Sequence, residues 1–271
     1  MKTISSMIER ISPRLAPARH WLAAAALTMC GATVAFAPSI ASAANKTLTV
    51  GSTPSGIPFT FLDVETNEIT GAMVDLIKAV GEDAGYEIVI QQSQFSSLIP
   101  SLRTGKIDVI SAAMLKTPER AEVVDFSNDI FPYAEGLVVQ SDNETQYSTL
   151  DDLAGEVIGA QVGTTYLEHL NDMGIFAEVR SYNTLADMMH DISLGRITAG
   201  IGDEPIIAYQ FSQDRFPELK LVESYQPEMV GQVGLAVNKG NSELLTTLNE
   251  SLAHLEEQGK IDAIFAEWGL K

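Results

Sequence analysis

Short apolar runs alternate with helically spaced apolar residues along the first part of the chain. Three runs predict buried strands: 47–50, 87–90 and 107–111. Two segments between them place their apolar residues on one helical face: 71–80 and 96–103. Gly85 and Gly105 follow these segments, where glycine commonly ends a helix. The strand–helix–strand–helix–strand order predicts an α/β domain with a mostly parallel sheet.

The same order returns after a break near residues 136–140. Strands are expected at 157–160 and 197–201, and helices at 166–173 and 184–194. A late strand at 234–237 precedes an amphipathic helix that starts at Asn241 and a last helix that holds residues 261–268.

Two segments, 98–113 and 188–203, share one plan: a helix, a glycine with a basic residue, and a strand that begins with isoleucine. Aligning Gly105 with Gly195 puts Ala113 opposite Asp203. Chance similarity between two α/β units explains the match as well as an internal repeat does. Either explanation implies two α/β lobes, and open α/β sheets bind ligands at the carboxyl ends of their strands.

The first 43 residues have the pattern of a secretory signal. A basic segment, 1–20, precedes an apolar run over 21–37, and Ala41-Ser42-Ala43 supplies the small residues of a cleavage site. We expect cleavage after Ala43 and a mature chain in the periplasm. An uncleaved membrane anchor is the alternative, because the apolar run approaches the length that spans a bilayer.

The charge of the chain excludes several kinds of partner. Lys and Arg number 17 against 36 Asp and Glu, so the formal net charge is −19. This acidity argues against binding nucleic acid, which needs basic patches, and against docking on anionic lipid. The single cysteine permits no intramolecular disulfide, and the four histidines show no zinc-site spacing. We therefore predict no metal and no cofactor.

A possible anion site follows the strand at 107–111. Thr117 is a good helix N-cap and Pro118 suits the first helical position, which leaves Arg120 in the first turn. A guanidinium grips a carboxylate with two hydrogen bonds. The alternative interpretation is a well-capped helix with a surface arginine.

Three further positions could contact a ligand. Gly163-Thr164-Thr165 combines a flexible residue, hydroxyls and a helix start, which suits a carboxylate. Asp203 ends a strand and could bind an ammonium group, or it could cap the helix that contains Pro205. Phe95 lies between a strand and a helix, where it could stack on a ligand or pack in the core.

A series of short motifs makes the mature chain resemble a known family over essentially its full length. These motifs are Ile57-Pro58-Phe59-Thr60-Phe61, 71–76 (GAMVDL), 95–102 (FSSLIPSL), 105–108 (GKID), 117–120 (TPER), 124–127 (VDFS), 163–165 (GTT) and 203–205 (DEP). In this order and spacing they resemble the bacterial solute-binding proteins, family 3, of polar amino-acid ABC transporters.

The resemblance implies the type II periplasmic-binding-protein fold, in which two α/β lobes joined by two hinge crossings close on a ligand like a Venus flytrap. Lobe 1 would comprise 44–137 and 236–271, and lobe 2 would comprise 138–235. By this resemblance Arg120 would hold the ligand α-carboxylate, Asp203 the α-ammonium, Thr165 the carboxylate from lobe 2, and Phe95 one wall. The expected ligand-binding set is Phe95, Ala113, Leu115, Arg120, Gln161, Thr164, Thr165 and Asp203.

Three positions depart from the family pattern. Leu115 replaces a small hydroxyl residue that binds carboxylate, Gly56 replaces an aromatic residue, and Met73 replaces an acidic residue. These changes open one wall of the site and remove one carboxylate contact. They favour a bulky, cyclic or partly apolar amino-acid derivative, such as an opine or an ectoine-like compound.

The favoured function is a monomeric binding protein that delivers an amino acid or derivative to the membrane permease of an ABC transporter. The main alternative is an enzyme on the same scaffold that resembles cyclohexadienyl or arogenate dehydratases, with Glu204 or Glu119 as the general acid. A sensory role without transport is a third reading.

Overall fold

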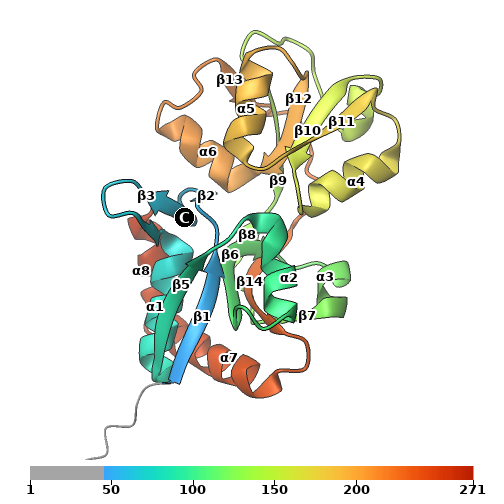
Figure 1. The fold of residues 1–271 in the computed structure, drawn as a ribbon. Coiled ribbons are helices and arrows are strands. Elements are labelled where there is room, and N and C mark those ends of the chain that lie inside the picture. Colours follow the sequence, from blue (N-terminus) through green and yellow to red (C-terminus); the bar gives the residue numbers. More distant parts are fainter. Residues whose placement is uncertain (1–45, 271) are drawn as a thin grey trace, which may run out of the picture. The chain divides into compact units, whose positions relative to one another are not determined.

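Two β-sheets and the helices around them organise residues 46–270, which the computed structural model describes (Figure 1). The predicted signal peptide, 1–43, lies outside these residues. Among residues 46–270, no helix has both the length and the apolar character needed to cross a membrane. Within the same range, no cluster of His, Asp or Glu is placed to hold a metal ion.

The first sheet has the strand order β5-β1-β6-β14-β7, with β8 paired to β14. Its strands are β1 (Lys46–Ser52), β5 (Tyr86–Gln92), β6 (Val109–Leu115), β7 (Val124–Phe126), β8 (Phe131–Tyr133) and β14 (Gly231–Asn238). β1 is parallel to β5 and β6, whereas β14 runs antiparallel to β6. Every residue of β6 is buried, so this central strand has no alternation of polar and apolar positions.

Helices from both ends of the chain accompany the first sheet. They are α1 (Ala72–Ala84), the 3₁₀ turn η1 (Phe95–Ser97), α2 (Leu98–Arg103), α3 (Pro118–Val123), α7 (Ser242–Glu257) and α8 (Lys260–Glu267). α1 ends at Gly85, which adopts the left-handed conformation (φ 74°), as predicted. Asn241 caps α7 by accepting a hydrogen bond from the Leu244 N–H, 3.3 Å.

A small antiparallel sheet lies between β1 and α1 in the sequence. It consists of β2 (Ser55–Gly56), β3 (Thr60–Asp63) and β4 (Glu68–Thr70). Phe59, just before β3, is fully buried and makes edge-to-face contacts with the rings of Phe131, Tyr133 and Phe265. This aromatic cluster anchors the small sheet to β8 and α8.

The second sheet has the order β11-β10-β12-β9-β13. Its strands are β9 (Glu135–Gln140), β10 (Val157–Gln161), β11 (Glu178–Tyr182), β12 (Ala199–Asp203) and β13 (Leu219–Leu221). The accompanying helices are η2 (Leu150–Leu153), α4 (Thr165–Met173), α5 (Leu185–Ser193) and α6 (Glu204–Ser212). β10, β11 and β12 are parallel, so the carboxyl ends of β10 and β12 lie at one edge of the sheet.

The chain passes twice between the two sheets. It leaves the first sheet after β8 and enters the second with β9, then returns between β13 and β14. The lobe boundaries that the family resemblance implies, 137/138 and 235/236, fall inside β9 and β14. β9 pairs with second-sheet strands from Glu135 onward, and β14 pairs with first-sheet strands from Gly231 onward.

The buried carboxylate of Glu135 ties the two crossings together. It accepts hydrogen bonds from the Tyr225 hydroxyl, 3.1 Å, and from the backbone N–H groups of Glu228 and Met229. Glu135 begins the first crossing into the second sheet, and residues 225–229 belong to the return segment. Three donors compensate the cost of burying this carboxylate.

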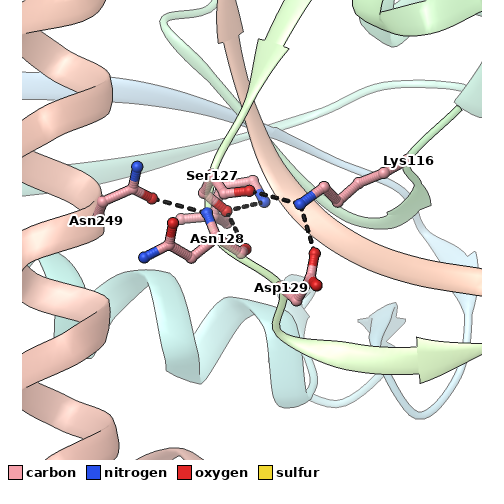
Figure 2. Close-up of polar contacts among 6 residues, drawn as sticks. Lys116, Ser127, Asn128, Asp129 and Asn249 are labelled. Carbon is pink, nitrogen blue, oxygen red and sulfur yellow. Dashed lines mark hydrogen bonds and ion pairs between the residues drawn. The ribbon is translucent and has the colours of Figure 1, made fainter. Parts of the chain in front are cut away.

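A second polar network fixes the turn after β7 (Figure 2). The Ser127 hydroxyl accepts from the Leu235 N–H, 2.9 Å, and Asn249 of α7 accepts from the Asn128 N–H, 2.8 Å. Lys116 donates to the Ser127 carbonyl, 2.8 Å, and pairs with Asp129, 2.5 Å. The network therefore holds the segment that leaves β6, immediately before the helix that carries Arg120.

Candidate functional site

Arg120 stands in the first turn of α3, held by the cap that the sequence predicted. The Thr117 hydroxyl accepts from the Arg120 N–H, 3.3 Å, and Pro118 occupies the first helical position. The side chain is not on the surface, because Arg120 is 8% exposed. Its guanidinium donates to the Leu115 carbonyl, 2.7 Å, and to the Gly163 carbonyl, 3.1 Å, and lies 5.6 Å from the centre of the Phe95 ring.

The Arg120–Gly163 hydrogen bond links the two lobes. Arg120 lies on α3, which belongs with the first sheet, and Gly163 precedes α4, which belongs with the second. Gly163 has φ 82° and packs against Ser96, where an added Cβ would lie 2.7 Å from the Ser96 Cα. Glycine is thus required at this position both for its backbone conformation and for the close approach. The loop before α4 consequently rests on η1.

The N-terminus of α4 faces the same space as Arg120. Thr164 is the N-cap: its hydroxyl accepts from the Leu167 N–H, 3.3 Å, and donates to the Gln161 carbonyl, 2.6 Å. The first turn of a helix leaves backbone N–H groups without intrahelical acceptors, and here these belong to Thr165 and Tyr166. The helix dipole adds a partial positive charge, so this end of α4 suits an anion.

Asp203 ends β12 and occupies the N-cap position of α6, but its side chain does not cap that helix. Its carboxylate instead accepts a hydrogen bond from the hydroxyl of Tyr166, 3.0 Å. Burial raises the pKa of Asp203 to about 6, against lowering effects of the Tyr166 hydrogen bond and the charge of Arg120. Of the two roles that the sequence left open, the capping role is not observed.

Two small adjoining cavities separate these groups. The arginine-side cavity is lined by Phe95, Ala113, Leu115, Arg120, Thr164, Thr165, Tyr166 and Asp203. The threonine-side cavity is lined by Thr53, Ser55, Gly56, Phe59, Thr60, Phe95, Ala112, Gln161, Leu185, Asp203 and Ile206. Phe95 and Asp203 belong to both walls. Larger surface hollows exist, but Arg120 and Asp203 line none of those described.

The eight residues of the expected binding set all line these two cavities. Seven surround the arginine-side cavity and Gln161 lines the other. Their roles toward a ligand remain predictions. Gln161 and Thr164 also stabilise the local structure, because the Gln161 amide donates to the Asn183 carbonyl, 3.0 Å, and Thr164 caps α4.

Ala113 contributes an unusual backbone to the arginine-side cavity. It adopts φ 49° although it is not glycine, and the pairing of β6 with β14 shifts register between Gly234 and Ala236. A side-chain-bearing residue in this region is strained. The irregularity lies two residues before Leu115, whose carbonyl accepts from Arg120.

Sequence reasoning missed several lining residues. Tyr166 follows the Gly163-Thr164-Thr165 motif directly, yet its partnership with Asp203 spans 37 positions and has no local signal. The hydroxyls of Thr53 and Thr60 lie 2.7 Å apart at the start of the small sheet. Tyr133 lines an outer hollow and neither of the two cavities, and the described residues offer its buried hydroxyl no hydrogen-bond partner. Burial, followed by the charge of Asp203, raises the pKa of Tyr133 well above its usual value.

Comparison with known proteins identifies the family of the chain. The family model for bacterial extracellular solute-binding proteins, family 3, matches residues 48–271. The chain belongs to this family. The predicted family and the predicted two-lobe α/β fold are thereby confirmed.

Relatives of this family 3 protein include the arginine-binding extracellular protein ArtP of Bacillus subtilis (strain 168). It is 30% identical over 247 residues, which cover 90% of this chain and 92% of ArtP. An ancestral arginine-binding protein bound to arginine superimposes with a TM-score of 0.74 at 32% identity, covering 82% and 97% of the two chains. The ancestral amino acid-binding protein AncCDT-1, a precursor of cyclohexadienyl dehydratase, gives 0.73 at 28% identity, covering 82% and 95%.

Proposed function

We propose that this family 3 protein captures an amino acid or amino-acid derivative between its two lobes and delivers it to the membrane permease of an ABC transporter. The observation that carries the proposal is the placing of one guanidinium, one carboxylate and one helix N-terminus around adjoining cavities. A zwitterion needs this set of partners, a cationic clamp for its carboxylate and an anion for its ammonium group. The binding of arginine by relatives supports the same class of ligand.

The ligand carboxylate would lie between Arg120 and the N–H groups of Thr165 and Tyr166, and its ammonium group would meet Asp203. The carboxylate would then replace the Gly163 carbonyl as an acceptor for Arg120. Because Arg120 comes from lobe 1 and Asp203 from lobe 2, the ligand binds the closed arrangement better than an open one. This difference in affinity is what shifts the equilibrium toward closure.

The proposed transport role also implies where the protein acts and what it contacts. We propose that the mature chain works as a monomer in the periplasm after removal of residues 1–43, and that the closed lobes form the surface that a permease recognises. Binding alone suffices for this role, and we assign no catalytic residue to it.

A matched pair of arginine variants tests the proposal. Arg120→Lys keeps the charge but loses the two-pronged geometry, so amino-acid binding measured by calorimetry should weaken at least about a hundredfold. Arg103→Lys changes an exposed arginine at the end of α2 and should bind as the wild type does. Unchanged affinity in Arg120→Lys would remove Arg120 from the carboxylate site.

A dehydratase activity is the second candidate, because a carboxyl group with a pKa of about 6 in a cavity resembles a general acid. The acids first considered for that role fit poorly. Glu119 is exposed and hydrogen bonds lower its pKa, and Glu204 lines hollows outside the two cavities. Incubation with prephenate or arogenate decides the matter, and we expect no product.

A further inference from the structure

We infer that the ligand carries no charge on its side chain, in contrast to the arginine that relatives of this chain bind. The inference rests on the proposed function, since it takes the zwitterion clamp of Arg120 and Asp203 as given. It concerns what the remaining walls of the two cavities can recognise.

The charges that line the cavities are fully used by the clamp. Among the described residues of both walls, Arg120 is the sole cation and Asp203 the sole carboxylate. The α-carboxylate of a ligand takes the first and the α-ammonium group takes the second. A guanidinium or ammonium side chain would find no second carboxylate, and a carboxylate side chain would find no second cation.

Other acidic residues around the site line neither cavity, and Glu135, whose charge acts on Tyr166, is held by three donors of its own. Glu119 and Glu168 line an outer hollow together with His169, and Glu204 lines hollows on the side of β8 and β13. Glu119 and Glu168 act on Arg120 through their charges, without a hydrogen bond to it. A charged side chain confined to the cavities would therefore be desolvated without a partner, which is costly.

The walls away from the clamp are neutral and mixed in polarity. The threonine-side cavity presents the Thr53 and Thr60 hydroxyls and Gln161 beside the apolar Phe59, Leu185 and Ile206. Hydroxyl and amide groups can hydrogen bond to an uncharged polar side chain, and the apolar residues pack on its methylene groups. An ectoine-like cyclic zwitterion belongs to this uncharged class, whereas an opine, with its extra carboxylate, does not.

A panel of size-matched ligands tests the inference on the wild-type chain by calorimetry. L-glutamine and L-glutamate differ in one charge, L-arginine and L-lysine carry the opposite charge, and L-methionine and ectoine extend the uncharged set. We expect the tightest binder to be uncharged, with glutamate, arginine and lysine at least about a hundredfold weaker.

The outcomes separate the two proposals. Tight binding of arginine, lysine or glutamate that is lost in Arg120→Lys would leave amino-acid capture standing and overturn the uncharged side chain. Absence of binding by every member of the panel would overturn the proposed function, and the inference would fall with it.

A gain of function provides the second measurement. Thr60→Glu adds a carboxylate to the threonine-side cavity, and Thr60→Gln adds the same bulk without the charge. If the number of carboxylates lining the cavities decides whether a cationic side chain can bind, the Glu variant should bind L-arginine at least about tenfold tighter than the Gln variant. Equal affinities in two variants with cooperative thermal unfolding would contradict the inference.

Discussion

The two halves of the clamp are built differently, although both place a charge in a confined site. Arg120 donates to two backbone carbonyls and lies over Phe95, and burial lowers its pKa from a value far above neutrality, so it stays charged. Asp203 accepts from a single hydroxyl, and burial raises its pKa to about 6. Arg120, which faces the ligand carboxylate, therefore keeps its charge at every physiological pH, whereas Asp203, which faces the ligand ammonium group, can lose its charge as the pH falls.

The largest expected effect in this comparison comes from Asp203→Asn, which keeps the size of the side chain but removes its charge permanently. Losing one partner of a buried charged pair should cost about 2–5 kcal/mol in ligand affinity. Calorimetry with the tightest ligand of the panel measures this loss. Asp214→Asn, at an exposed position, is the control and should change nothing; a loss below about 0.5 kcal/mol in Asp203→Asn would exclude the ammonium role.

A pH titration exposes the same difference without mutation. The ligand requires the ionised form of Asp203, so affinity should be constant above about pH 7 and fall by up to about tenfold per unit below pH 6. Calorimetry between pH 5 and 8 checks this, and Asp203→Asn should lose the dependence. An affinity that stays flat across this range in the wild type would contradict the protonation of Asp203.

The folding stability of the ligand-free protein depends on pH in the opposite direction to ligand affinity. The folded pKa of Asp203 lies above the unfolded value of about 4, so without ligand the folded chain binds more protons between about pH 4 and 6. Asp203 therefore stabilises the fold at the low end of this window, and the contribution is lost as pH rises through about 6.

Tyr166→Phe removes the hydroxyl that donates a hydrogen bond to Asp203. This hydrogen bond lowers the pKa of Asp203 in the ligand-free protein, so its loss should move the pH midpoint upward and weaken binding at a fixed pH below the new midpoint, by up to about tenfold per pH unit of the shift. The pH-dependent calorimetry described above measures both changes. Tyr209→Phe, in an outer hollow, should behave as the wild type; a midpoint that does not move would show that Tyr166 leaves Asp203 unaffected.

Tyr133→Phe should have the smallest effect, and we expect it to stabilise the fold. The Tyr133 hydroxyl is buried with no partner among the described residues, so its removal should raise the free energy of unfolding by up to about 1 kcal/mol. Urea unfolding measures the change, and ligand affinity should stay the same. A drop in affinity above about 1 kcal/mol would instead make Tyr133 a ligand contact.

Local signals in the sequence predicted much of this fold. The cap at Thr117 and Pro118 and the glycine that ends α1 depend on neighbouring residues, so they could be read directly. The predicted helix at 96–103 begins as a 3₁₀ turn and continues as α2, a distinction that the apolar spacing does not carry.

Contacts between distant segments could not be read in this way. Tyr166 meets Asp203 across 37 positions, and Glu135 takes its donors from residues about ninety positions away. The left-handed backbone at Ala113 could not be predicted from the sequence either, because alanine disfavours that conformation and the surrounding structure imposes it. The chain's motifs therefore indicated which residues gather at the cavities, but not which partners set their charges.

Arg120 of lobe 1, with the start of α4, is proposed to hold the ligand carboxylate, and Asp203 of lobe 2 its ammonium group. Truncated ligands measured against both variants test this assignment most directly; for L-glutamine these are 4-aminobutanamide, which lacks the carboxylate, and glutaramic acid, which lacks the amine. We expect Arg120→Lys to weaken the binding of glutaramic acid but not of 4-aminobutanamide, and Asp203→Asn to weaken the binding of 4-aminobutanamide but not of glutaramic acid. If both variants weakened both truncated ligands equally, or neither ligand at all, the division of the clamp between Arg120 and Asp203 would be contradicted.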